Sequence, residues 1–498
     1  MNAFFAFAWK KKDNRPFVLA AVAGILIQWV LFKWAYPYPD FFSDSYSYIA
    51  TASRNLDISI WPIGYSKFLR AFHALTHSDT ALVSFQFFFL EITALYFFTT
   101  LRYFYALSRR NSRILAIALF FNPLLLYFCN YVNSDPIFCA LSLWWMTELI
   151  WILNRPRAYQ VFTQALLLFL AFTVRNNAYV YPLIAGLVFL LSRAGWRFKV
   201  SGILLGPLLI LPFVLYTESA AQQLTGTRQF SLFTGWMLAN NALYMREYIQ
   251  VSPEELQGAA SPELDSLAKA FFRTVKDEDG YRENLANYPG NYFVREPRAP
   301  LKVYFARHNH YTPGMDLVKA WGKASADFAP YGKSLILHHP LAYARYFMGL
   351  NLRDYLLPPL EKLEVYNLGE DEVDASAKDW FDYPTAQVHA IDKDVQGYIL
   401  YIFPVLFAVL HVFLLFWIGT MLYKGRYRAL PLVTQKTLWV LGAFLLANCL
   451  FCLFATIIVL RYEVFPGIVV LSMVLLCQDS LGEASRGDGN SPAAQAVQ

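Results

Sequence analysis

The chain has 498 residues, of which 57% are apolar, 18% aromatic and only 16% charged, with a formal net charge of +6. This balance excludes an ordinary soluble globular protein and is typical of an all-α polytopic membrane protein. The positive charge does not indicate a nucleic-acid partner, because the basic residues gather in short loops between apolar runs, where they fit membrane topology and the headgroups of membrane lipids.

Apolar runs that could cross a membrane recur along the chain. A helix needs roughly 20 such residues to cross about 30 Å of hydrocarbon. On this basis we expect about ten transmembrane helices, near residues 17–35, 81–100, 114–129, 136–153, 160–174, 178–192, 202–217, 397–422, 437–460 and 463–477. The first run lacks a small-residue cleavage pattern, so we interpret it as a retained helix and not as a removable signal peptide.

These runs divide the chain into four parts. We expect an N-terminal transmembrane module of about seven helices at 1–217 with its first outer loop at 36–80, a mostly helical extracytoplasmic domain at 218–396 covering the outer face, a C-terminal transmembrane module of about three helices at 397–477, and a disordered cytoplasmic tail at 478–498. Within the second part, His338, His339 and Pro340 interrupt an apolar stretch, which we interpret as an amphipathic helix at the membrane interface.

Lysines and arginines predict the orientation. They concentrate in the loops that share a side with the N-terminus, at 10–15, 102–113, 155–157, 193–199 and 424–436. The positive-inside rule therefore predicts that both termini are cytoplasmic and that the other loops are extracytoplasmic, in an inner (plasma) membrane.

Acids and arginines recur at the outer ends of the expected helices. Asp40 and Asp44 follow the first helix, Asp135 lies between the third and fourth, Arg175 ends the fifth, and Arg461 ends the ninth. Taken singly, each could cap a helix or reach from the bilayer to the interface. Together they indicate a site, because ionisable groups beside hydrocarbon are costly and usually functional.

A sugar carried on polyprenyl phosphate presents an anionic leaving group at this depth. A carboxylate could take the proton of an acceptor hydroxyl or amine, and arginines could neutralise the phosphate. We find no glycine-rich nucleotide-binding motif. The scattered histidines do not indicate a metal site, so we expect no required cofactor and leave a divalent metal open.

The ordered stretches "SDSYSYIATA", "WPIGYSKFLRAFHAL", "NSDPIFCALSLWW", "RNNAYVYPL", "HHPLAYARYF" and "RYEVFPGIVVL" resemble the membrane-embedded GT-C glycosyltransferases. The resemblance is closest to the branch of protein mannosyltransferases and lipid A aminoarabinose transferases. It covers about residues 17–216 and 397–477, and the middle of the chain is matched only by position and by the "HP" helix. It implies a GT-C-like fold and an inverting, single-displacement reaction.

The resemblance also implies roles for individual residues. Asp44 matches the acid of the family's first loop, which implies the catalytic base, and Asp135 is similar to the second-loop acid, which implies a role in orienting the substrate or the base. Arg461 and Tyr462 match a late Arg-Tyr pair near the lipid phosphate, and Arg175 is placed to help.

Three further residues are candidates for substrate binding. Tyr48 follows Asp44 in the matched motif. Tyr65 lies in a stretch that matches the family's P-x-G-Y-P, with Ser66 in place of the last proline. Asp40 is the main rival of Asp44 for the role of base, and we interpret it as a residue that surrounds the site or caps the helix.

The sequence therefore predicts an integral-membrane glycosyltransferase that moves a sugar from a polyprenyl-phosphate donor to a lipid, glycan or protein acceptor on the extracytoplasmic side. The alternative is a transporter or flippase for a lipid-linked or anionic substrate. That alternative predicts charges along a path through the bilayer, whereas here, apart from Glu91 and Glu148, the charges gather at helix ends. A glycan polymerase or ligase would differ only in donor size and stays open.

Overall fold

The computed structural model of the protein describes residues 2–105, 107–276, 278–288, 290–309, 315–423, 425–455 and 457–486. Over these residues the regular structure is helical, and the only extended pairings are two isolated bridges, Asp40 with Tyr131 and Glu372 with Gln387. The prediction of an all-α chain is therefore confirmed.

Eight helical segments in the described residues are long and apolar enough to cross a membrane. They are α2 (Arg15–Ala35), α5 (Asp79–Tyr105), α6 and α7 together (Arg109–Phe120 and Pro123–Cys129), α8 (Ser134–Asn154), α11 (Trp196–Thr225), α21 and α22 together (Val395–Leu400 and Phe403–Tyr423), α23 (Leu432–Ala455) and α24 (Leu460–Arg486). They are the helices of a multi-pass membrane protein.

Eight of the about ten expected helices correspond to these long segments. Two of the expected spans correspond to shorter apolar helices, α9 (Tyr159–Val174) and the η1–α10 segment (Asn176–Val180 and Tyr181–Leu191). The 16 residues of α9 rise about 24 Å, less than the thickness of the hydrocarbon. The chain breaks between them at Arg175, whose backbone is extended.

The boundaries of two expected parts also differ. Helix α11 continues to Thr225, eight residues beyond the expected end of the N-terminal module at 217, and α24 continues to Arg486, where we expected a disordered tail from 478. The rest of the expected tail, 487–498, lies outside the described residues.

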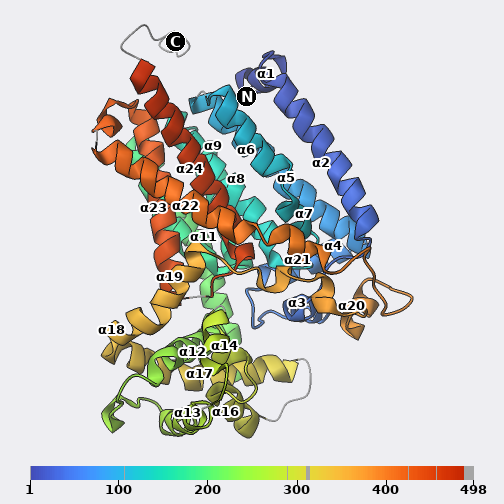
Figure 1. The fold of residues 1–498 in the computed structure, drawn as a ribbon, viewed down its shortest axis with the longest axis vertical. Coiled ribbons are helices and arrows are strands. Elements are labelled where there is room, and N and C mark those ends of the chain that lie inside the picture. The colour runs from blue at the N-terminus through green and yellow to red at the C-terminus, as the bar shows by residue number, and fades with distance from the viewer. Residues whose placement is uncertain are drawn as a thin grey trace.

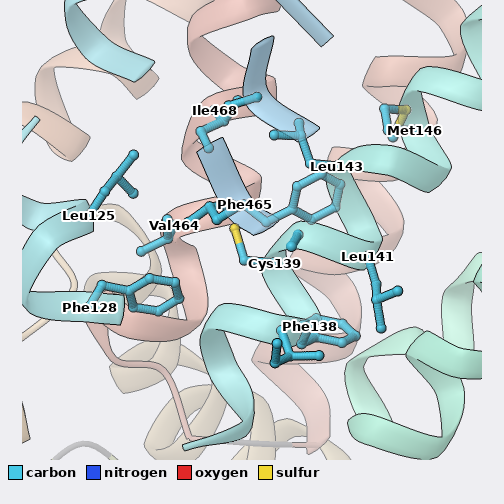
Figure 2. Packing of buried hydrophobic residues seen from close by; sticks show 14 of the residues in the cluster. Leu125, Phe128, Phe138, Cys139, Leu141, Leu143, Met146, Val464, Phe465 and Ile468 are labelled. Carbon is cyan, nitrogen blue, oxygen red and sulfur yellow. The ribbon is translucent and has the colours of Figure 1, made fainter. Parts of the chain in front are cut away.

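Helices α8 and α24 form the centre of the bundle. Figure 2 shows Cys139 and Leu143 of α8 beside Phe465 of α24, and all three side chains are buried. By contrast, α11 and α21–α22 bury few of their apolar side chains, which suits contact with lipid tails.

The remaining elements lie at the two ends of the bundle. Near one end lies α1 (Asn2–Lys10), together with the last turns of α24 (Figure 1). At the opposite end is a group of helices that we call the cap (residues 234–348): α12 (Thr234–Arg246), η2 (Pro253–Glu255), α13 (Ser261–Val275), α14 (Tyr281–Asn287), α15 (Tyr292–Arg295), α16 (Pro300–His308), α17 (Met315–His338), α18 (Pro340–Tyr343) and η3 (Ala344–Met348).

The cap has a hydrophobic core of its own. Trp236 of α12 stacks on Trp321 of α17 with ring centroids 4.1 Å apart, and both lie in an aromatic group with Phe305 and Phe328. The two helices approach closely at Gly332, where an added Cβ would lie 2.3 Å from the backbone of Leu238. This core makes the cap a distinct packing unit.

The chain returns from the cap to the bundle through α19 (Gly349–Leu356). The Tyr343 hydroxyl donates a hydrogen bond to the carbonyl of Phe454, and the Asn351 amide donates to that of Cys452 over 3.1 Å, so both satisfy carbonyls at the end of α23. Short elements complete the described chain: α3 (Ser43–Ser53), α4 (Gly64–His73), η4 (Glu361–Leu363), η5 (Tyr366–Gly369), α20 (Ala375–Trp380) and η6 (Arg426–Ala429).

Candidate active site between the bundle and the cap

Arg461, in the first turn of α24, lies at the centre of a buried group of acids and bases. Its Nη1 atom is 2.9 Å from Oδ2 of Asp135, and its Nη2 atom is 3.4 Å from Oε2 of Glu361 and 3.9 Å from Oδ2 of Asp44. The Arg461 side chain is only 5% exposed. One guanidinium therefore faces three carboxylates that come from distant parts of the sequence.

Asp135 is held from three sides. It forms a second ion pair with Arg175, and the Asn133 amide donates to its Oδ2 atom over 2.7 Å. Asn133 is the N-cap of α8 and Asp135 lies in its first turn, where the positive end of the helix dipole favours a carboxylate. With both oxygens occupied, Asp135 is suited to holding the two arginines and not to accepting a proton.

Asp44 is the least constrained of the three carboxylates. Its side chain is 19% exposed, against 5% for Asp135 and 6% for Glu361. Its closest partners are Arg461 at 3.9 Å and the hydroxyl of Ser43 at 3.5 Å. Asp44 is thus a carboxylate that an incoming molecule can reach.

Two aromatic rings lie against the arginines. The guanidinium groups of Arg175 and Arg461 lie 4.1 and 4.5 Å from the ring centroid of Tyr462. The guanidinium of Arg461 lies 5.0 Å from the ring centroid of Phe42, and the ammonium of Lys362 lies 4.5 Å from it. Cation–π contacts of this kind hold the charged groups in place without neutralising them.

Tyr48 and Tyr65 lie behind this group. The Tyr48 hydroxyl is 3.0 Å from that of Ser134, which also accepts a hydrogen bond from Arg175. Burial raises the pKa of the Tyr48 phenol, which keeps it neutral. Tyr65 is fully buried, packs against Tyr48 with ring centroids 4.9 Å apart and donates to Gln86. Tyr65 thus lies behind Tyr48 among protein side chains, and the substrate contact that we expected of it stays a prediction.

Asp40 lies apart from the two arginines. Its Oδ1 atom accepts the backbone N–H of Asn367 over 2.9 Å, and the amide of Gln396 lies 3.5 Å from its Oδ2 atom. The side chain is buried, and this burial raises the pKa of the Asp40 carboxyl to about 8. Asp40 therefore joins the first loop to two later segments and contacts the arginine group only indirectly.

Sequence reasoning missed three members of the group. Glu361 pairs with Arg461 and with Arg295 of the cap, and Lys362 donates to the Ser43 hydroxyl over 3.0 Å. Burial alone would raise the pKa of Glu361, but the charges of Arg461 and Arg295 outweigh it and hold the pKa below its ordinary value. For Glu361 and Lys362 the available signal was an acid and a base one residue after two prolines in an apolar stretch, "LPPLEKL".

The described residues contain no group of three or more histidine, cysteine or acidic side chains arranged to hold a metal ion. Comparison of the chain with protein-family models, with curated proteins and with solved structures found no match. Function is therefore argued from the arrangement of these side chains.

Proposed function

We propose that the protein is an integral-membrane glycosyltransferase that moves a sugar from a polyprenyl-phosphate donor to a hydroxyl or amine of an acceptor on the extracytoplasmic side of the membrane. The observation that carries the proposal is the pairing of a reachable carboxylate, Asp44, with Arg461, which is itself fixed beside Arg175 by Asp135. This combination offers a base and a preorganised anion site next to each other.

In the proposed reaction the acceptor, the donor phosphate and Asp44 each have one role. The acceptor oxygen or nitrogen attacks C1 of the sugar, and the bond from C1 to the phosphate oxygen breaks with its electron pair remaining on the phosphate. The acceptor proton passes to Asp44, which later releases it to water. A single displacement of this kind inverts the configuration at C1.

Charge develops on the leaving phosphate, and the arginines are placed to meet it. The Nε atom of Arg461 is buried and has no hydrogen-bond partner in the described part of the chain. Since a buried donor without a partner is costly, a phosphate oxygen would supply what the site lacks. Arg175, over the ring of Tyr462, and Lys362, over the ring of Phe42, add positive charge near Arg461.

The test is transfer of a labelled sugar from a panel of polyprenyl-phosphate sugars by the full-length protein in detergent, with donor hydrolysis as a second readout. We expect Asp44→Asn to reduce turnover by about 10²–10⁴-fold, the usual contribution of a general base. Asp371→Asn is the matched control, because Asp371 is 74% exposed and pairs only with Lys393 at 2.6 Å.

Folded Asp44→Asn protein that retains full turnover would contradict the assignment of the base. Counterflow of labelled substrate across proteoliposomes, with no covalent product from any donor, would instead favour the transporter or flippase alternative.

A further inference from the structure

The cap contains a cavity of about 490 Å³ whose lining includes no member of the acid–arginine group. It lies between the segment that follows α11 and the second half of α17. A volume of this size accommodates a small organic ligand.

The two charged side chains of the cavity are both basic. Arg228 and Lys333 line it, together with the imidazole of His338, and no aspartate or glutamate does. Lys333 is exposed and has no ion-pair or hydrogen-bond partner among the residues that the structure describes, and Arg228 pairs with Glu218, which does not line the cavity. The cavity is therefore electrostatically suited to an anion.

Its uncharged groups suit a hydroxyl-bearing molecule. Gln229, Gln257 and Ser334 line the cavity. The Gln229 amide already donates to the carbonyl of Gly322 over 2.8 Å and the Ser334 hydroxyl to that of Glu255 over 2.7 Å, which leaves the Gln229 amide oxygen and the Gln257 amide for a ligand. Pro330, inside α17, has no N–H to donate to the carbonyl of Ala326 four residues earlier, and both residues line the cavity. Alanine, leucine and proline side chains supply an apolar surface beside these polar groups, the mixture that a saccharide with polar edges and C–H faces requires.

One short segment connects this cavity to the candidate active site. Residues 227–229 line the cap cavity, and the next two residues, Phe230 and Ser231, line a smaller one. The smaller cavity is also lined by Asn176, the neighbour of Arg175, and by residues 57–63 of the first loop. The segment 227–231 thus lines both cavities, and the smaller one reaches the residue next to Arg175 in the chain.

We propose that the cap cavity binds an acidic saccharide, a sugar bearing a phosphate or carboxylate group, as part of the acceptor. The assignment of this ligand as acceptor rests on the proposed function. The anion is held by Lys333, with Arg228 beside it in its pair with Glu218. The sugar hydroxyls bond to the Gln257 amide, to the amide oxygen of Gln229 and to the Ala326 carbonyl, which receives no N–H from Pro330.

The experiment is binding of glucose 6-phosphate, glucuronate, glucose and inorganic phosphate to the full-length protein in detergent, measured by isothermal titration calorimetry. We expect the two acidic sugars to bind and glucose to bind at least about tenfold more weakly. Lys333→Gln should weaken binding of the acidic sugars about tenfold. Lys319→Gln, which removes the same charge from an exposed position of α17 outside the cavity, should leave it unchanged.

Three results would overturn the proposal. Glucose could bind as well as the acidic sugars, inorganic phosphate could bind as tightly as glucose 6-phosphate, or the two lysine variants could behave alike. Failure of either acidic sugar to bind at millimolar concentration would do the same.

This experiment is independent of the test of the active site. We expect Asp44→Asn to bind the acidic sugars like the unaltered protein, because Asp44 does not line the cavity. If the acidic sugars bind selectively but no donor is turned over, the proposal for the cap cavity stands and the proposed glycosyltransferase activity is contradicted. If a donor is turned over but the acidic sugars do not bind, the glycosyltransferase proposal stands and the proposal for the cavity is contradicted.

Discussion

Asp135 and Asp44 face the same guanidinium, yet their environments predict opposite consequences for substitution. Asp135 is buried between two arginines. Asp135→Asn takes the paired carboxylate from Arg175 and the closest one from Arg461, and should lower the free energy of unfolding by about 3–5 kcal/mol. Asp44 is partly exposed and 3.9 Å from its partner, so Asp44→Asn should cost less than about 1 kcal/mol. Thermal unfolding of both variants in detergent measures the difference, and equal losses would contradict the separate roles of the two acids.

Asp40 predicts a dependence of stability on pH. Its pKa is about 8 in the folded protein and 3.8 in its ordinary state, so between these values the unfolded chain has released a proton that the folded protein retains. Stability is therefore lost as pH rises through this window, by up to about 1.4 kcal/mol per pH unit. Asp40→Asn mimics the protonated acid and should gain stability relative to the unaltered protein from pH 5 to pH 8. Unfolding midpoints at several pH values measure this gain, and parallel curves would show that Asp40 does not titrate in the window.

The sequence was sufficient to find Asp44, Asp135, Arg175 and Arg461, because each charged residue stands at the end of an apolar run and such positions can be read without a structure. Glu361 and Arg295 could not be found in this way. They belong to the segment between the two membrane modules, where local patterns indicate helices but do not say which residues return to the bundle. Their place follows from long-range packing alone.

At the scale of helices, the approach of α12 to α17 depends on residues without a side chain. A Cβ on Gly332 would meet the backbone around Leu238 at 2.3 Å, and the backbone of a packed helix cannot yield cheaply. Gly332→Ala should therefore destabilise the cap by about 1–3 kcal/mol or more. Gly186→Ala in α10 is the control, because nothing lies within 4 Å of its added Cβ, and it should be neutral or slightly stabilising. The unfolding midpoints of the two variants test this, and equal values would contradict the close approach.

Element types were predictable and element lengths were not. Apolar runs located all eight long helices, but α6 and α7 are separated at Asn122, whose side chain caps the second helix through the N–H of Leu124. The apolar run is interrupted there by Asn122 and Pro123, an N-cap residue followed by a proline at the first helical position, and a search for apolar length alone passes over this signal. The break at Arg175, by contrast, was predictable, because a charged residue separates the two apolar runs there.

For the whole molecule, the arrangement of the two ends predicts an accessibility pattern. The first helix and the last turns of α24 lie at one end of the bundle and the cap lies at the other (Figure 1). With the N-terminus cytoplasmic, a membrane-impermeant maleimide should label Glu254→Cys in intact cells and label Lys12→Cys only after permeabilisation. Both positions are exposed. Four of the five native cysteines are buried, so we expect little labelling of the unaltered protein. The reverse pattern would invert the predicted topology.

The separation of the clustered charges along the chain has a consequence for biogenesis. During synthesis, Asp135 and Arg175 emerge about 40 residues apart and can pair early, whereas Arg461 emerges only with the last helix. Until then, Asp44 and Glu361 have no arginine at the centre of the group. Insertion of α24 therefore completes the charge balance of the nascent protein, so a chain that stops short of residue 461 should be recognised by membrane quality control as unfinished.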